Sequence, residues 1–94
     1  MNLLLSSLLF LAHPVQEHTD CLIRTGQAMK AQGRSSVDYA SAIHGACRET
    51  RDALMTYQVP RMKASAEDPA ALVWGMIADL EAEAVRSYAA STGR

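Results

Sequence analysis

Two short motifs in this 94-residue chain have residue types and spacing suited to chemistry. His18 precedes Cys21 by three positions, and His44 precedes Cys47 by the same interval. On a helix, residues i and i+3 share a face, so each motif would present an imidazole beside a thiol. The two cysteines could join as a disulfide, or two thiolates and two imidazoles could hold zinc or copper tetrahedrally. The chain has only these two cysteines, so each outcome excludes the other.

The residues between the two motifs predict a helical hairpin. Gly33 suits the left-handed position that ends a helix. Ser35, followed by Asp38 three positions later, predicts a capping box that starts the next helix. Together these signals place a turn near Arg34.

The position of the turn favours a disulfide. Cys21 lies 13 residues before Arg34 and Cys47 lies 13 residues after it, so a hairpin that turns there brings the sulfurs level. His18 then lies opposite Thr50. The metal site needs His18 opposite Cys47 and Cys21 opposite His44, which moves the turn to between residues 32 and 33. We therefore expect a Cys21–Cys47 disulfide and keep the site of His18, Cys21, His44 and Cys47 as the alternative.

The remaining pattern predicts an all-α fold, with an antiparallel three-helix bundle and the disulfide across its first hairpin. Helices are expected at about 14–32, 36–59 and 69–90 in a domain spanning 14–90, followed by a tail at 91–94. Asp68 before Pro69 is a helix start signal, and Pro60 ends the second helix. The apolar stripe of the second helix is Ala40, Ile43, Cys47, Thr50, Leu54 and Tyr57. The inner face of the third is Val73, Ile77, Leu80, Ala84 and Tyr88, with Glu81, Glu83 and Arg86 on its outer side.

The N-terminal segment 1–13 is expected to be an export signal. Its run Leu3–Ala12 is apolar apart from two serines and has the length of a signal core, too short for a bilayer-spanning helix of about 20 residues. An even number of cysteines fits an oxidising compartment. We expect a periplasmic or secreted protein without a transmembrane span. No basic residue precedes the run, and an uncleaved apolar helix that docks on a membrane or a partner is the other interpretation.

Composition and motifs disfavour several classes of function. The formal net charge is −1, and the basic residues are scattered, which does not indicate a nucleic-acid-binding surface. The chain lacks a phosphate loop, a dinucleotide fingerprint and a nucleophilic serine motif. Cys47 beside His44 lacks an orienting third group. We therefore expect no catalytic residues and no cofactor.

One stretch resembles a known group of proteins. Cys21, a spacing of about 25 residues, and then Ala46-Cys47-Arg48-Glu49 with Arg51 and Ala53-Leu54 resemble small exported two-cysteine helical proteins of alphaproteobacteria. The resemblance covers residues 21–57. It implies an exported helical protein and supplies no catalytic residues.

The expected function is therefore non-enzymatic: a small exported helical protein that acts on another protein through its surface. Two alternatives stay open. The first is a zinc- or copper-binding protein that uses both His-x-x-Cys motifs. The second is a small subunit that docks on a membrane complex through its N-terminal apolar helix.

Overall fold

The structure is a computed structural model, and it describes residues 13–92 of the 94-residue chain. These residues form the α-helices α2 (Pro14–Ala31), α3 (Ser36–Ala46), α4 (Arg48–Gln58) and α5 (Pro69–Thr92), with a 3₁₀ turn η1 (Pro60–Met62). Within this part of the chain there is no strand, so the expectation of an all-α fold is confirmed. The apolar run expected at 3–12 lies outside the described residues.

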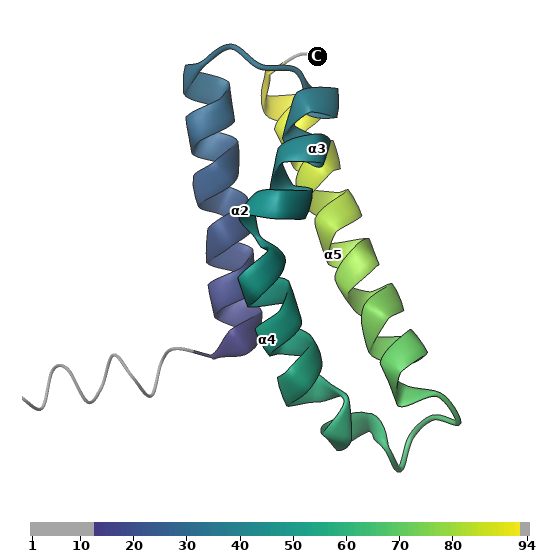
Figure 1. The fold of residues 1–94 in the computed structure, drawn as a ribbon. Helices are drawn as coiled ribbons and strands as arrows, with labels where there is room; N and C mark the ends of the chain where they lie inside the picture. Colours follow the sequence, from purple (N-terminus) through teal and green to yellow (C-terminus); the bar gives the residue numbers. More distant parts are fainter. Residues whose placement is uncertain (1–12, 93–94) are drawn as a thin grey trace, which may run out of the picture.

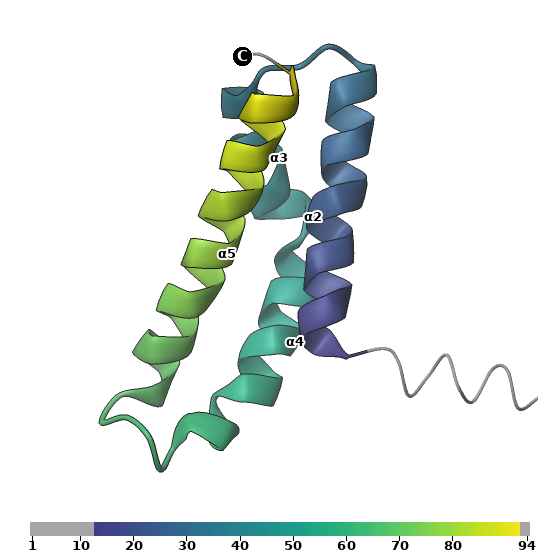
Figure 2. The same cartoon turned by 180° about the vertical axis from the view of Figure 1, so that it is seen from behind.

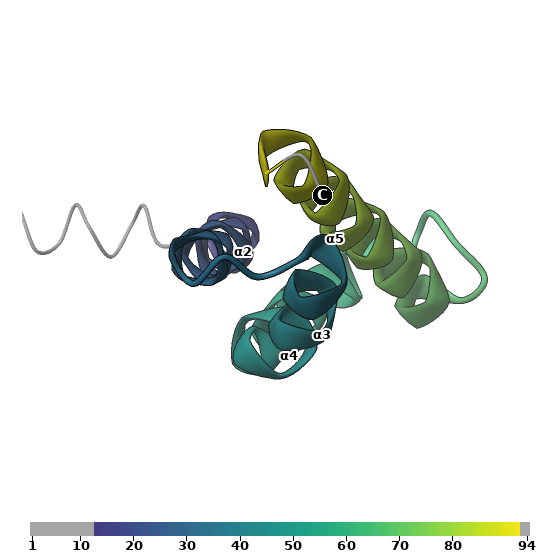
Figure 3. The same ribbon diagram turned by 90° about the horizontal axis from the view of Figure 1, so that it is seen from above.

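The chain passes three times along the length of the molecule. In Figure 1, α2 runs in one direction, α3 and α4 return together, and α5 runs in the direction of α2 again. Seen from above, α2, the α3–α4 pair and α5 lie at three corners (Figure 3). α2 and α5 therefore flank one face, and α3 with α4 lies behind it.

Backbone hydrogen bonds explain the turn after α2. Gly33 has φ 70°, a conformation that glycine adopts without steric cost. Its N–H donates to the carbonyl of Lys30 at 3.0 Å, and the N–H of Arg34 donates to the carbonyl of Met29 at 3.0 Å. This pair of bonds is the Schellman motif, which satisfies carbonyls at the end of a helix. The turn therefore lies where the sequence placed it.

Side-chain caps begin the next two passes. The hydroxyl of Ser35 accepts a hydrogen bond from the N–H of Asp38 at 3.2 Å, and the carboxylate of Asp68 accepts one from the N–H of Ala71 at 3.1 Å. Each cap satisfies one of the N–H groups that a first helical turn leaves without a backbone partner.

Where one helix was expected over residues 36–59, the structure has two that meet at Cys47. The backbone of Cys47 leaves the helical region, with φ −110° and ψ 23°. The guanidinium of Arg51 donates to the carbonyls of His44 and Ile43 at 3.0 and 3.1 Å. The carbonyl of Ile43 also accepts from the N–H of Cys47 at 3.1 Å. Arg51 thus adds donors at the end of α3, where a helix leaves carbonyls without an intrahelical partner.

The apolar core consists of two clusters. The first contains Cys21, Leu22, Tyr39, Ile43, Cys47 and Tyr88, and the second contains Leu54, Val73 and Ile77. Tyr39 is buried and the neighbouring Ala40 is exposed, so the expected inward position of Ala40 was wrong. Tyr39 lies four residues before Ile43 and so shares its helix face.

Among the described residues, no helix combines the length and the apolar character needed to cross a membrane.

Candidate functional site

The predicted disulfide is confirmed. Cys21 of α2 and Cys47 at the junction of α3 and α4 are bonded, with their Cα atoms 5.8 Å apart. Both residues are buried in the first apolar cluster. The hydroxyl of Thr25 lies 3.7 Å from the sulfur of Cys47, within range of a weak hydrogen bond to it. The disulfide thus fixes α2 to the second pass of the chain.

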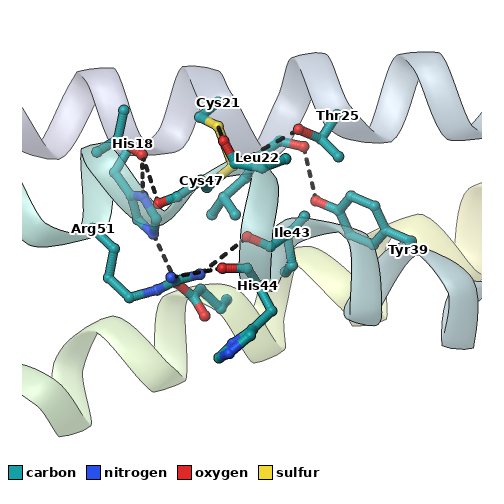
Figure 4. The surroundings of a disulfide bond; sticks show 12 residues. His18, Cys21, Leu22, Thr25, Tyr39, Ile43, His44, Cys47 and Arg51 are labelled. Atoms are coloured by element: carbon teal, nitrogen blue, oxygen red, sulfur yellow. Dashed lines mark hydrogen bonds and ion pairs between the residues drawn. A yellow bond between two sulfur atoms is a disulfide. The ribbon is translucent and has the colours of Figure 1, made fainter.

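The structure does not bring the four alternative metal ligands together. Both sulfurs are used by the disulfide, so neither is a thiolate. The imidazole of His44 is exposed and points away from the sulfurs, as Figure 4 shows. In the described part of the chain, no group of three or more His, Cys, Asp and Glu side chains has the arrangement of a metal site.

His18 instead belongs to a buried polar network. Its side chain is 0% exposed, and its Nδ1 lies 2.8 Å from the hydroxyl of Thr50 on α4. Its Nε2 lies 2.9 Å from Oε2 of Glu81 on α5. The disulfide register predicted the position of His18 opposite Thr50, and the contact follows from it.

Arg51 completes the network. Its Nε donates to the same Oε2 of Glu81 at 2.7 Å, while its two terminal nitrogens donate to backbone carbonyls at the end of α3. Glu81 therefore accepts from two nitrogen donors, and its side chain is only 19% exposed. Among the described residues, no buried side-chain nitrogen or oxygen lacks a partner. We name His18, Thr50, Arg51 and Glu81 the central polar network.

The hydroxyl of Thr50 can serve the network in two ways. Its Oγ1 also lies 3.1 Å from the carbonyl of Cys47. If Thr50 donates to that carbonyl, Nδ1 of His18 donates to Thr50 and the imidazole carries both protons. If Thr50 donates to Nδ1, His18 is neutral and keeps its proton on Nε2, facing Glu81. In both arrangements, the polar atoms of His18 and Thr50 have hydrogen-bond partners. A network of this kind stabilises the fold.

The expectation that Glu81 lies on the outer side of its helix was wrong. Glu81 follows Ile77 by four residues, at the margin of the apolar face of α5. A carboxylate at such a margin usually faces water. It turns inward here because Arg51 and His18 supply donors, and a pattern of polar and apolar letters on one helix does not contain that information.

A long apolar groove lies between α2 and α5. Its larger hollow has a volume of about 420 Å³. The apolar lining comes from Leu22, Ile23 and Gly26 of α2, Tyr39 of α3, and Leu80 and Ala84 of α5. A smaller hollow of about 110 Å³ shares Leu80, and its other lining residues are Val15 of α2, Leu54 and Gln58 of α4, and Val73, Met76 and Ile77 of α5. Figure 2 looks onto the face that α2 and α5 flank. We name the two hollows together the α2–α5 groove.

Large apolar side chains are exposed along this groove. Ile23 lines the larger hollow and is 52% exposed, while Val15 and Met76 line the smaller one and are 40% and 46% exposed. Leu72, which is also 40% exposed, lies one helical turn before Met76. Exposed large apolar side chains gathered at a hollow are typical of an interaction site.

Tyr39 forms part of the wall of the groove. Its hydroxyl donates to the carbonyl of Leu22 at 2.9 Å, and its ring stacks on that of Tyr88 with centroids 4.5 Å apart. Burial raises the pKa of Tyr39 above its ordinary value of 10.0, and the negative charge of Glu81 and then Tyr88 add to the effect. Tyr39 therefore contributes a neutral surface to the groove at physiological pH.

No protein-family model matches this chain, and neither the curated proteins nor the solved structures contain a significant match to it. The assignment of a function therefore rests on the disulfide, the central polar network and the α2–α5 groove.

Proposed function

We propose that this chain is a small exported, non-enzymatic helical protein that binds a helix of another protein in the α2–α5 groove. The observation that carries the proposal is the groove itself, an apolar channel with Ile23 and Met76 exposed along it. An apolar groove between two helices is a recurrent way for proteins to bind an amphipathic helix.

The direction of the helices supports a helical ligand. We treat the three passes as an antiparallel three-helix bundle in which α3 and α4 together form the middle member. α2 and α5 run in the same direction (Figure 1). In a four-helix bundle, neighbouring helices are commonly antiparallel. A helix that lies between α2 and α5 and runs against both would complete such a bundle.

The disulfide and the N-terminal segment support export. Disulfides persist in periplasmic and extracellular proteins and are rare in the cytosol. The run Leu3–Ala12 has the length and the composition of a signal core. The resemblance of residues 21–57 to exported two-cysteine helical proteins agrees with a periplasmic or secreted location.

The proposal can be tested by site-specific photo-crosslinking in cells. A photoreactive phenylalanine analogue replaces Ile23 in the groove or, as the control, Val37 of α3, which is 76% exposed and lines neither hollow. We expect one protein to be crosslinked from position 23 and not from position 37. Mass spectrometry of the product should place the crosslink in a helical segment of that partner.

Substitutions then separate binding from folding. With the photoreactive residue kept at position 23, Met76→Lys puts a charge into the groove at an exposed position. We therefore expect loss of the crosslinked product with an unchanged helical circular dichroism spectrum. Val37→Lys is the matched control and should leave the product unchanged. Equal crosslinking from positions 23 and 37, or a product that survives Met76→Lys, would contradict the proposal.

A further inference from the structure

We infer that the helix bound in the α2–α5 groove carries an aspartate or glutamate in its first turn, and that this carboxylate pairs with Lys30. The inference rests on the helix binding proposed above and adds the charge of the partner and the direction in which it lies. Lys30 decides which end of the partner helix lies at which end of the groove.

The two ends of the groove differ. Val15, in the first turn of α2, lines the smaller hollow, and Lys30, in the last turn, lines the larger one. α5 follows the same order, because Val73 near its start lines the smaller hollow and Ser91 near its end lines the larger one. The stretch of α2 from Val15 to Lys30 spans about 22 Å, which is the length of a helix of about 15 residues. A partner helix of that length reaches both ends.

One charge in the lining of the groove has no carboxylate to neutralise it. Among the residues that line the two hollows, only Lys30 and Glu83 are charged. Glu83 is already paired, because its Oε1 accepts a hydrogen bond from Arg86 at 2.7 Å. Within residues 13–92, no carboxylate lies within ion-pair distance of the amine of Lys30. The groove therefore complements an apolar helix face that has one anionic group at the Lys30 end.

The helix dipoles place that anionic group at the start of the partner helix. α2 and α5 run in the same direction (Figure 1), so their C-termini, which carry partial negative charge, both lie at the Lys30 end of the groove. A partner helix that runs against both has its N-terminal turn there. Aspartate and glutamate are favoured in the first turn of a helix. A carboxylate in that turn meets Lys30, whereas a basic residue would face both Lys30 and the positive end of its own helix.

The order of crosslinks along the partner tests the direction. A photoreactive phenylalanine analogue replaces Gln27, which lines the larger hollow, or Val15, which lines the smaller one, and both positions are exposed. We expect the crosslink from position 27 to lie nearer the N-terminus of the partner segment than the crosslink from position 15. The two crosslinks should be about 12 residues apart, because both helices rise by about 1.5 Å per residue.

A cycle of charge substitutions tests the ion pair. The probe is a synthetic peptide of the crosslinked segment, and fluorescence anisotropy measures its affinity for the purified chain at low salt. Lys30→Gln should weaken binding about two- to fivefold, as should replacement of the first-turn carboxylate by its amide. The two changes together should weaken binding no more than either one alone. Lys63→Gln is the matched control, at an exposed position that lines neither hollow, and should leave the affinity unchanged.

Three results would overturn the inference and leave helix binding in place. Crosslinks in the reverse order would place the partner parallel to α2. A partner segment without aspartate or glutamate in its first turn would lack the predicted group. Unchanged affinity in Lys30→Gln, or additive losses in the cycle, would show that Lys30 serves only the C-terminal end of its own helix. The absence of a crosslinked helix from either position would instead overturn helix binding, and this inference with it.

Discussion

The carboxylate of Glu81 connects three passes of the chain through a single oxygen. Oε2 lies 2.9 Å from Nε2 of His18 on α2 and 2.7 Å from Nε of Arg51 on α4. Arg51 is nearly inaccessible to solvent, and His18 is completely so. Removing an anion from such a site leaves buried donors without an ionised acceptor, which is costly in a medium of low polarity.

We therefore expect Glu81→Gln to destabilise the fold. The free energy of unfolding should fall by about 2–3 kcal/mol, less than for a fully buried pair because the carboxylate is partly exposed. Glu83→Gln is the matched control on the same helix. Glu83 pairs with Arg86 at the surface and is 64% exposed, so this change should stay within about 0.5 kcal/mol. Denaturant unfolding of both variants measures the difference, and equal effects would refute the role given to Glu81.

Tyr39 predicts how stability depends on alkaline pH. The pKa of Tyr39 in the folded protein lies above its ordinary value of 10.0. The folded protein therefore binds the phenol proton more tightly than the unfolded chain does. This contribution to stability is complete below the ordinary pKa and is lost as the pH rises through the folded value. Urea midpoints should therefore fall less steeply in Tyr39→Phe than in the parent chain between about pH 9 and pH 11. Parallel curves would show that Tyr39 does not carry the effect.

At the scale of the helices, caps and close contacts decide where each element begins, ends and packs. Gly33, Ser35 and Asp68 make the capping contacts that their types predict, because each capping bond involves residues within a few positions along the chain. The break at Cys47 is different. At this point Cys47 is bonded to Cys21 of α2, and Arg51 donates to two carbonyls of α3. The sequence did not predict a helix break there.

Gly26 and Gly75 allow a test of helix packing with opposite outcomes. A Cβ at Gly75 meets no atom within 4 Å, so Gly75→Ala should raise the free energy of unfolding by about 0.5–1 kcal/mol through helix propensity alone. At Gly26 the added carbon would lie 3.3 Å from the ring of Tyr39 and 3.6 Å from that of Tyr88. Gly26→Ala should therefore gain none of this stability. Thermal unfolding of the two variants checks the prediction, and an equal gain at both positions would contradict the close approach.

At the scale of the whole molecule, the disulfide and the central polar network link different pairs of the three passes. The disulfide links α2 to the α3–α4 junction covalently, whereas α5 is held by noncovalent contacts such as Glu81 and the hydrogen bond from the hydroxyl of Tyr88 to the carbonyl of Arg34 at 2.7 Å. For a chain of this size, a single core supplies little stability, so each restraint matters.

Loss of the disulfide should cost a large part of the total stability. The bond closes a loop between residues 26 positions apart, and constraint of the unfolded chain by such a loop corresponds to about 3–4 kcal/mol. We expect Cys21→Ala with Cys47→Ala to lower the free energy of unfolding by that amount in guanidinium titrations. A reductant should lower the stability of the parent chain and leave the double variant unchanged. A reductant effect on the variant would point to a cause other than this bond.

The sequence alone determined the features that depend on near neighbours or on one simple register. The all-α composition, the caps at Gly33 and Ser35 and the pairing of Cys21 with Cys47 follow from helix propensity, local hydrogen bonds and equal distances from a turn. Tertiary structure decided the rest. Glu81 turns inward because donors arrive from two other helices. Arg51 donates back to α3 where the second pass breaks. The two hollows lie where side chains of α2 and α5 meet those of α3 or α4. These features depend on contacts between residues distant in the chain, and the periodicity of a single helix does not record its neighbours.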